Sequence, residues 1–338
     1  MSEKLKVVIP MAGFGTRLRP HTWSKPKQLI SVAGKAVIDH VLGMFSTLPD
    51  PQNIELVFVV GYLGEQMLPH MRENYPHLTV HYVEQEEMRG QSHAVYLTKE
   101  HLHGPLLIVF ADTLIDTDLS FLQDEEAEAV IWVKPVPDPR RFGVTMVGED
   151  SWVTRLIEKP KDMDNNLAVV GCYYFKRSED LLTAIEEQMQ RGIQLKSEFY
   201  LADAINLMLN RGMRMRVETV DVWLDAGTPN TLLETNAYLL AHGCDNTHEV
   251  EKRPGVVVVT PVYIHPQAQV ESVIVGPNVS VGAGSCIKRS ILSDSIIEEN
   301  ARVENAVLQK SWVGCHAQVQ GRESIIDIGD HSAITLET

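Results

Sequence analysis

Aliphatic residues recur at a spacing of six through the last third of the chain, and this period restricts the fold more than any other feature. A period of six fits neither an α-helix nor an alternating strand. It is typical of a parallel β-helix, in which each aliphatic anchor points inward and stacks on the next coil. At three hexapeptides a coil, about four coils are expected; an ordinary β-sandwich with chance spacing is the alternative. The anchors are Ile264, Val270, Val275, Val281, Ile287, Ile297, Val303, Val313, Val319, Ile328 and Ile334.

Short apolar runs alternate with helical patterns in the earlier part of the chain. The runs "KVVI", "IELVFVV" and "PLLIVFAD" are continuously apolar, as expected of strands buried on both faces. Alternation of this kind predicts an α/β domain of the Rossmann-like type, with a mixed, mostly parallel sheet between helices. The expected organisation is therefore an α/β domain at 1–243, a linker at 244–255 and a β-helix domain at 256–338.

The charge balance excludes some classes of function. The chain has 30 Lys and Arg against 45 Asp and Glu, a net charge of −15, whereas a general nucleic-acid binder needs a basic face. Its apolar runs are far too short to span a bilayer, and its start does not read as a signal peptide. Four scattered cysteines without a C-x-x-C pair favour reduced thiols. We therefore expect a cytoplasmic protein with neither nucleic acid nor membrane as partner.

The loop after the first predicted strand is an island of positive charge. Residues 4–38 contain no Asp or Glu, but seven Lys and Arg. Gly13 and Gly15 let backbone N–H groups approach an anion, and Arg17 and Lys27 can neutralise phosphate oxygens. Since ligands of open α/β sheets bind at the carboxyl ends of strands, these residues indicate a polyphosphate cradle. The loop matches neither the dinucleotide fingerprint nor the Walker A motif, and a tight turn with solvated basic side chains is the alternative for its two glycines alone.

The longer string "AGFGTRLRP…PKQLISVAGKAVIDHVL" resembles the opening of the sugar-nucleotidyltransferases, or nucleotide-sugar pyrophosphorylases. Collinear matches follow at "VVGYLGEQ", "EQEEMRGQSHAV", "FADTLI", "FGVTMV", "LIEKP", "VVGCYYF" and "VWLDAGTPNTLLETN". The tail is similar to the left-handed parallel β-helix of long members, and the whole is most similar to the long-type glucose-1-phosphate thymidylyltransferases. The chain departs from the family at Ala36, usually proline, and at Ala111, glycine in many relatives.

The resemblance implies the reaction of a nucleoside triphosphate with a sugar 1-phosphate, giving an NDP-sugar and pyrophosphate. The sugar phosphate would attack the α-phosphorus in line, so the protein chiefly neutralises charge and aligns groups. The expected substrates are dTTP or UTP with glucose 1-phosphate. Synthesis of UDP-N-acetylglucosamine, ADP-glucose or GDP-mannose remains open, as do acetyl transfer by the β-helix and a catalytically inactive regulatory subunit. The β-helix is expected to hold a homo-oligomer together.

The resemblance also implies which residues form the site. Arg17 and Lys27 match the catalytic positions. The nucleotide is expected to contact Ala12, Gly13, Gly15, Thr16, Gln85 and Gly90. The sugar phosphate is expected to contact Gly143, Glu158, Lys159, Gly171 and Tyr173. The expected cofactor is Mg²⁺, held by Asp112 and Asp225.

Some of these roles have plainer alternatives in the residues themselves. A lone Asp at a strand end, such as Asp112, is more often a turn former than a metal ligand. Tyr173 is as readily a core aromatic as a lining of the sugar pocket. Glu158 and Lys159 are neighbours, so both can face one ligand only if their strand ends or twists there, which Pro160 favours. The amide of Gln85 can donate and accept, which suits the imide edge of uracil or thymine.

Overall fold

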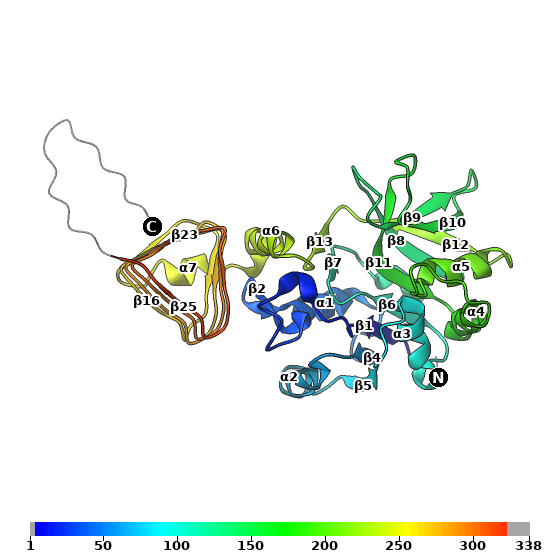
Figure 1. Ribbon diagram of the computed structural model, residues 1–338, viewed down its shortest axis with the longest axis horizontal. Helices are drawn as coiled ribbons and strands as arrows, with labels where there is room; N and C mark the ends of the chain where they lie inside the picture. The colour runs from blue at the N-terminus through cyan, green and yellow to red at the C-terminus, as the bar shows by residue number, and fades with distance from the viewer. Residues whose placement is uncertain (1–3, 323–338) are drawn as a thin grey trace, which may run out of the picture. The chain divides into compact units, whose positions relative to one another are not determined.

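The computed structural model describes residues 4–322, and in them the chain forms two compact units (Figure 1). One unit contains residues 4–31 and 35–235, and the other contains residues 32–34 and 236–322. The boundary falls within helix α6 (Pro229–Leu239), whereas the sequence predicted one at residue 243. The division into functional domains stays a prediction.

A nine-stranded mixed sheet forms the centre of the first unit (Figure 1). Its strands are β1 (Lys6–Pro10), β4 (Glu55–Val60), β5 (Thr79–Glu84), β6 (Leu106–Val109), β8 (Ala129–Pro135), β9 (Gly143–Val147), β10 (Val153–Glu158), β11 (Leu167–Phe175) and β12 (Met215–Thr219). Strands β6, β1, β4 and β5 are parallel neighbours. The long strand β11 joins them antiparallel through β6 and pairs on its other side with β8 and β9, which β12 and β10 extend. The predicted Rossmann-like mixed sheet is thereby confirmed.

The helices of this unit pack on the sheet through apolar stripes. They are α1 (Val37–Gly43), α2 (Met67–Asn74), α3 (Gln91–Leu97), α4 (Ser178–Gln190) and α5 (Leu201–Leu209), with short 3-10 helices η3 (Met44–Thr47), η4 (Gly64–Gln66), η5 (Lys99–His101) and η6 (Ser120–Gln123). Leu181 and Ile185, spaced by one turn of α4, are fully buried with Ile205 of α5 in the same core as Ile108 and Ile131 of the sheet. This core holds in place the loops that leave the strands.

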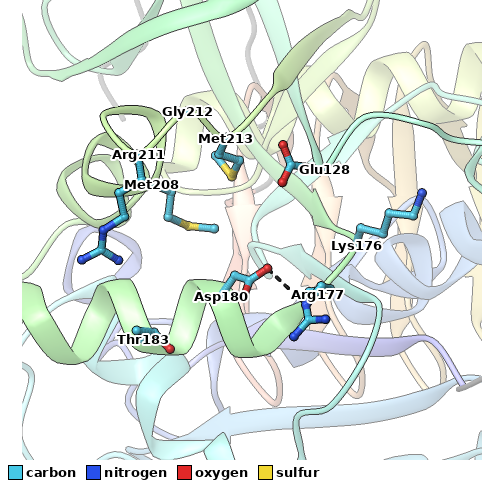
Figure 2. Close-up of a pocket in the computed structure, with 9 residues that line it drawn as sticks. All are labelled: Glu128, Lys176, Arg177, Asp180, Thr183, Met208, Arg211, Gly212 and Met213. Atoms are coloured by element: carbon cyan, nitrogen blue, oxygen red, sulfur yellow. Dashed lines mark ion pairs between the residues drawn. The ribbon is translucent and has the colours of Figure 1, made fainter.

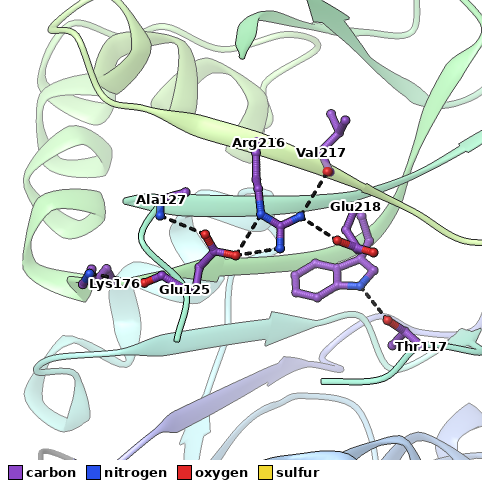
Figure 3. Close-up of polar contacts among 8 residues, drawn as sticks. Thr117, Glu125, Ala127, Lys176, Arg216, Val217 and Glu218 are labelled. Carbon is purple, nitrogen blue, oxygen red and sulfur yellow. Dashed lines mark hydrogen bonds and ion pairs between the residues drawn. The ribbon is translucent and has the colours of Figure 1, made fainter. Parts of the chain in front are cut away.

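An ion-pair network fastens the segment before β8 to strand β12 (Figure 3). The Arg216 guanidinium donates to Glu125 at 2.8 Å and to Glu218 at 2.6 Å, and it lies 4.7 Å from the ring centroid of Phe121. Trp132 Nε1 donates to Thr117 Oγ1 at 3.0 Å. Because a planar guanidinium presents several donors in fixed directions, Arg216 holds both carboxylates at once. The chain between residues 117 and 127 is therefore fixed to the sheet.

The second unit is a left-handed parallel β-helix of three stacked sheets, as predicted. One sheet contains β14 (Val256–Val258), β17 (Val273–Val275), β20 (Ile291–Ser293) and β23 (Val307–Gln309). The second contains β15 (Val262–Ile264), β18 (Val279–Val281), β21 (Ile296–Ile297) and β24 (Trp312–Val313). The third contains β16 (Gln269–Glu271), β19 (Cys286–Lys288), β22 (Arg302–Glu304) and β25 (Gln318–Gln320). All pairs are parallel, and each sheet has four strands, in agreement with the expected four coils.

The coils are shorter than three unbroken hexapeptides. Val256 pairs with Val273, 17 residues on, and Cys286 pairs with Arg302, 16 residues on. Three columns of corner residues adopt the left-handed backbone conformation, which makes the turns tight. They are Ser272, Arg289 and Asn305; Asn278, Asp294 and Lys310; and Gly284, Asn300 and His316. The predicted repeat is therefore right in kind, but the coil is one or two residues shorter than expected.

The predicted anchors among the described residues lie in or against the β-helix core. Seven are buried: Ile264, Val275, Val281, Ile287, Ile297, Val303 and Val313. Val270 and Val319 are partly buried and pack against the same core. Ile328 and Ile334 lie outside the described residues.

Residues before the first coil close the core of the β-helix. The chain passes from a π-helical turn (Leu240–Cys244) into helix α7 (Thr247–Val250). The Asn246 side chain makes two hydrogen bonds of 2.9 Å to the backbone N–H and C=O of Ile264. Val250 is fully buried in the β-helix core. Asn246 thus completes the backbone pairing of a strand that has no preceding coil, and Val250 covers the apolar end.

Candidate active site

The basic loop keeps its shape through buried contacts. Gly15 has a φ of 60°, and its carbonyl accepts hydrogen bonds from Thr22 Oγ1 and from the N–H of Leu18, both at 2.9 Å. Leu18 and Thr22 are buried, whereas Gly13, Thr16 and Arg17 are exposed. The loop and its 3-10 helix η1 (Thr16–Leu18) therefore expose Gly13, Thr16 and Arg17, whereas the predicted Ala12 is buried and Gly15 is half-buried.

Two lysines of the basic island belong to another part of the protein. Lys6 is buried at the start of β1, where its Nζ lies 2.5 Å from Glu55 Oε2, and Lys4 lies 3.6 Å from the same carboxylate. The cradle loop follows the opposite end of β1. Lys4 and Lys6 therefore belong to the basic island of the sequence but not to the predicted cradle, because a strand separates them from it.

Lys27 and Asp112 form an ion pair. Lys27 begins the 3-10 helix η2 (Lys27–Leu29), and its Nζ donates to Asp112 Oδ2 at 2.6 Å. Buried Gln28 donates from Nε2 to the carbonyl of Met11 at 3.2 Å, which ties η2 to the start of the basic loop. Burial pushes the pKa of Asp112 upward, but the charge and hydrogen bond of Lys27 outweigh it and hold that pKa below its usual range. The Asp112 carboxylate is therefore ionised at neutral pH.

A short antiparallel ribbon brings Asp225 to Asp112. Strand β7 (Thr113–Ile115) begins directly after Asp112, and β13 (Trp223–Asp225) ends with Asp225, which pairs with Thr113. The Ala226 N–H donates to the Asp112 carbonyl at 3.2 Å. Burial, and next the negative charge of Asp112, raise the pKa of Asp225. Like charges held in one site favour a bound cation.

Arg17 reaches the same place. A Cβ placed on Gly227 would lie 2.8 Å from Asp225 Oδ1 and 3.3 Å from Arg17 Nη2. The Gly227 N–H itself donates to Asp225 Oδ1 at 2.9 Å. The predicted catalytic and metal-binding residues therefore converge, although 208 positions separate Arg17 from Asp225 in the sequence.

The carboxylates fit Mg²⁺ as part of a ligand set. Among residues 4–322 there is no group of three or more His, Cys, Asp or Glu that could hold a metal by itself. Mg²⁺ is commonly bound through one or two carboxylates together with substrate phosphates and water. Asp112 and Asp225 match that pattern of partial protein ligation.

Strand β10 ends at Glu158, as expected from Pro160. Lys159 has a φ of 49°, and its N–H donates to the Phe142 carbonyl at 2.9 Å. This turn brings Lys159 Nζ to 3.6 Å from Glu158 Oε1, so the two side chains share one face. Burial raises the pKa of Glu158 more than Lys159 lowers it.

The other predicted sugar-site residues lie on β9 and β11. Gly143 pairs with Glu158 across β9 and β10, and a Cβ there would lie 3.1 Å from Glu158 Oε2. Gly171 sits at an irregular point of β11, and its carbonyl accepts the Phe110 N–H two residues before Asp112. Tyr173 is 5% exposed and belongs to the sheet core, and burial raises its pKa. The contacts of Tyr173 favour the core alternative, and its sugar contact stays a prediction.

Gln85 and Gly90, predicted for the base, lie against each other. Gln85 follows β5 and is buried, and its Nε2 donates to the Gly90 carbonyl at 3.3 Å. The same nitrogen lies 3.1 Å from His93 Nδ1. Gly90 has a φ of 100°, and a Cβ there would lie 2.6 Å from the backbone of Phe199, so only glycine fits.

Sequence reasoning missed Phe199 and Tyr200, which contact both predicted subsites. Phe199 packs on Gly90, and the Tyr200 hydroxyl accepts a hydrogen bond of 3.0 Å from Lys159 Nζ. No spacing signal in "SEFYL" marks them, because the contacts join segments far apart in the sequence.

A separate cavity of about 300 Å³ contains none of the predicted site residues (Figure 2). It lies beside α4 and the end of α5, and Arg177 and Asp180 form an ion pair of 3.2 Å at its edge. The cavity therefore does not mark the predicted site.

Among residues 4–322, no helix has the length and apolar character needed to cross a bilayer.

Comparisons with known proteins agree with this geometry. The sequence profile described as nucleotidyl transferase matches residues 6–242. The chain is 29% identical over 232 residues to the UTP–glucose-1-phosphate uridylyltransferase AglF of Haloferax volcanii, and the match covers 67% of this chain and 92% of that protein. It is 26% identical over 368 residues to a glucose-1-phosphate thymidylyltransferase of Streptomyces griseus, and the match covers 99% of this chain and 100% of that protein.

Two further matches cover about 70% of the chain. The bifunctional protein GlmU of Methanocaldococcus jannaschii is 32% identical over 237 residues, 70% of this chain and 54% of that protein, so the match spans about half its length. A solved structure of UDP-glucose pyrophosphorylase with UDP-glucose has a TM-score of 0.59 at 20% identity, covering 71% of this chain and 100% of that one. At that identity the structure shows a shared fold alone.

Proposed function

The chain belongs to the nucleotidyl transferase family and is a sugar-1-phosphate nucleotidyltransferase, and we propose that it joins dTTP or UTP to glucose 1-phosphate. The products are the corresponding NDP-glucose and pyrophosphate. The observation that carries this proposal is the convergence of Arg17, Lys27, Asp112 and Asp225 at the carboxyl end of the parallel strands. A site for two polyanions needs cations for the phosphates and carboxylates for a divalent ion.

Arg17 and Lys27 bind the triphosphate in this proposal. Arg17 and Lys27 lie on the loop and the 3-10 helices η1 and η2 that follow β1. Lys27 is held by Asp112, so nucleotide phosphates compete with that carboxylate for the ammonium group. Lys27 then stabilises the negative charge that develops at the α-phosphate, which is the main contribution that a preorganised cation makes to such a reaction.

Asp112 and Asp225 would hold Mg²⁺. The ion would neutralise phosphate charge and align the two substrates for in-line attack. The two residues are suited to it because the ribbon of β7 and β13 fixes their backbones side by side. The pKa of Asp225 is raised first by burial and next by repulsion from Asp112, and a bound cation would relieve that repulsion.

Glu158 and Lys159 bind the sugar phosphate in this proposal. The turn at Lys159 directs an ammonium group and a carboxylate to the same side. The ammonium group suits the phosphate, and the carboxylate can accept hydrogen bonds from sugar hydroxyls. Gly143 leaves room beside Glu158, because a Cβ there would lie 3.1 Å from Glu158 Oε2. Gly171 lies against Phe110 and Thr113, and its sugar contact stays a prediction.

The base would bind beside Gln85 and Gly90. The Gln85 Nε2 is already engaged with Gly90 and His93, which orients the amide. An oriented amide can select the imide edge of uracil or thymine. The uridylyl and thymidylyl relatives support this choice over a purine, and synthesis of UDP-N-acetylglucosamine, ADP-glucose or GDP-mannose is the alternative.

The experiment that tests the function measures pyrophosphate release with Mg²⁺. Each of dTTP, UTP, ATP, GTP and CTP is paired with glucose, N-acetylglucosamine and mannose 1-phosphates, and Lys27→Ala serves as the control. Release that needs both substrates, prefers dTTP or UTP with glucose 1-phosphate and is lost in the variant supports the proposal. A preference for a purine nucleotide contradicts the choice of base. No release from any pair favours the alternative of a catalytically inactive regulatory subunit.

We also propose that the β-helix holds a homo-oligomer together through an exposed aliphatic ladder. Val257, Ile274, Ile291 and Val307 pair in register on consecutive coils. They are 59, 40, 43 and 76% exposed. A contiguous apolar row on a flat sheet is typical of an interface. A second copy is the partner that we propose, because an uncharged aliphatic face lets two chains of net charge −15 meet without bringing like charges into direct contact.

Light scattering of the full chain tests the ladder. Ile291→Glu combined with Val307→Glu places carboxylates on the ladder, and we expect the subunit count to fall. Gln318→Glu, an exposed position on the third sheet, is the control and should leave it unchanged. A wild-type monomer, or an unchanged count in the double variant, contradicts the proposal.

A further inference from the structure

The segment Glu198–Tyr200 contacts two parts of the proposed substrate site at once. On the nucleotide side, Phe199 N–H donates to the Arg89 carbonyl at 2.9 Å, and the Ser92 N–H donates to the Phe199 carbonyl at 3.0 Å. These bonds lie on either side of Gly90, against which the Phe199 backbone packs. Phe199 is therefore fastened to the loop that would bind the base.

Tyr200, the next residue, contacts the proposed sugar-phosphate lysine. Its hydroxyl accepts a hydrogen bond of 3.0 Å from Lys159 Nζ, which also lies 4.8 Å from the centroid of the Tyr200 ring. The ion pair of this ammonium group with Glu158 is longer, at 3.6 Å. Tyr200 thus makes the shorter of the two contacts and meets Lys159 with both its hydroxyl and its ring face.

Tyr200 is itself held rigidly. It is 6% exposed and precedes α5. Its carbonyl accepts a hydrogen bond of 3.0 Å from the side chain of Gln188, which is buried on α4. The N–H of Leu201 donates to the Gln91 side chain at 3.4 Å. Helices α3, α4 and α5 therefore all fix its position.

Lys159 needs such a support. It lies one residue beyond the end of β10, and its side chain is 43% exposed. A lysine side chain has four rotatable bonds, and an exposed one samples many rotamers that point away from a ligand. One hydrogen bond to a fixed acceptor removes most of these rotamers and leaves two ammonium N–H donors for a phosphate.

We propose that Tyr200 is a positioning residue that holds the Lys159 ammonium group in place for the sugar phosphate. This inference rests on the proposed function, in which Lys159 binds that phosphate. Burial raises the pKa of Tyr200, so its hydroxyl is neutral and can accept a hydrogen bond from Lys159. The same hydrogen bond raises the pKa of Lys159, which keeps the amine protonated.

The first test is the kinetics of Tyr200→Phe, which keeps the ring and removes the hydroxyl. We expect KM for glucose 1-phosphate to rise about tenfold, the typical effect of losing a hydrogen bond to a charged group. The values of kcat and of KM for the nucleotide should change less than about threefold, because the nucleotide residues are untouched. Tyr96→Phe is the matched control: Lys99 Nζ lies 4.8 Å from the Tyr96 ring centroid, and no kinetic change is expected.

The second test does not depend on activity. NMR of ¹⁵N-lysine-labelled protein follows the titration of Lys159 Nζ, with its signal assigned by its absence in Lys159→Arg. We expect the pKa of Lys159 to fall in Tyr200→Phe and to stay unchanged in Tyr96→Phe.

The two tests separate this inference from the proposed function. An unchanged Lys159 titration in Tyr200→Phe overturns the inference, whatever the reaction is. A fall in kcat together with equal rises in KM for glucose 1-phosphate and for the nucleotide also overturns it, since such changes indicate general damage to the fold. If no substrate pair gives pyrophosphate, the proposed function fails, and the titration alone decides whether Tyr200 holds Lys159.

Discussion

The Nζ atom of Lys27 lies 2.6 Å from Oδ2 of Asp112, so a predicted phosphate-binding residue and a predicted metal ligand neutralise each other. Both side chains are less than a quarter exposed. A nucleotide and a divalent ion would each take one partner of this pair. The pair thus keeps both charges compensated until the substrates arrive.

Lys27→Met should leave Asp112 without its main partner. We expect it to lower activity by roughly 10² to 10³, as for loss of one preorganised donor. It should also lower the free energy of unfolding by about 2 kcal/mol, because Asp112 then lies largely buried and unpaired. Urea unfolding without added metal measures the second effect.

A double-mutant cycle isolates the pair. Asp112→Asn added to Lys27→Met should recover stability by about 1–2 kcal/mol, because the unpaired carboxylate is gone. Activity should stay lost. Additive stability losses in the double variant would show that the two side chains do not interact.

Asp225→Asn should make the protein more stable and less active. Burial and the charge of Asp112 raise the pKa of Asp225, so the ionised form is disfavoured in the folded state. This penalty is complete above the folded pKa and absent below the unfolded value of 3.8. We therefore expect a higher Tm at pH 7 by roughly 2–4 °C, and no difference near pH 3.

Magnesium gives the second readout for Asp225. Addition of Mg²⁺ should raise the Tm of the wild-type protein and leave that of Asp225→Asn nearly unchanged, because ligands of the folded state stabilise it in proportion to their affinity. Glu234→Gln, on the following helix α6, is the control. An equal Mg²⁺ effect in all three proteins would place the ion elsewhere.

Glu55→Gln should destabilise the protein in a pH-dependent way. Glu55 compensates Lys6, which is 2% exposed, and the hydrogen bond from Lys6 lowers the pKa of Glu55. A lowered carboxyl pKa stabilises the fold fully above its unfolded value of 4.5, and this stabilisation is lost as the pH falls from there through the lower folded pKa. We expect a loss of about 2 kcal/mol at pH 7, a smaller one near pH 4, and the smallest below the folded pKa.

Thermal unfolding at several pH values measures the effect of Glu55→Gln. Glu73→Gln, an exposed position on α2, should change nothing. A loss in Glu55→Gln that is the same at pH 4 and pH 7 contradicts the ion-pair explanation.

Gly90→Ala should damage the fold and the base site together. The residue has a φ of 100°, and a Cβ would meet Phe199 N and O at 2.6 Å. We expect a loss of about 2 kcal/mol or more in urea unfolding and a rise in KM for the nucleotide. Gly43→Ala is the control, because no atom lies within 4 Å of a Cβ there and its φ is −59°. Equal stability of both variants would refute the packing of Phe199 on Gly90.

The sequence alone predicted the features that depend on local pattern. Continuous apolar runs identified β1, β4 and β6, because a strand buried on both faces has no polar side. Six-residue spacing identified the β-helix, because each coil repeats the same inward contacts. Pro160 marked the end of β10 beside Lys159. The family resemblance supplied residue roles that the pattern could not.

Tertiary structure decided which of these residues meet. The pairing of β7 with β13 places Asp225 beside Asp112, and no spacing between positions 112 and 225 encodes it. The start of β1, and not the cradle loop, holds Lys6. Tyr200 reaches Lys159 only because three helices fix the segment before α5. Periodicity reports which side of an element is buried, whereas a site depends on which elements pack together, and that choice is made by the whole core.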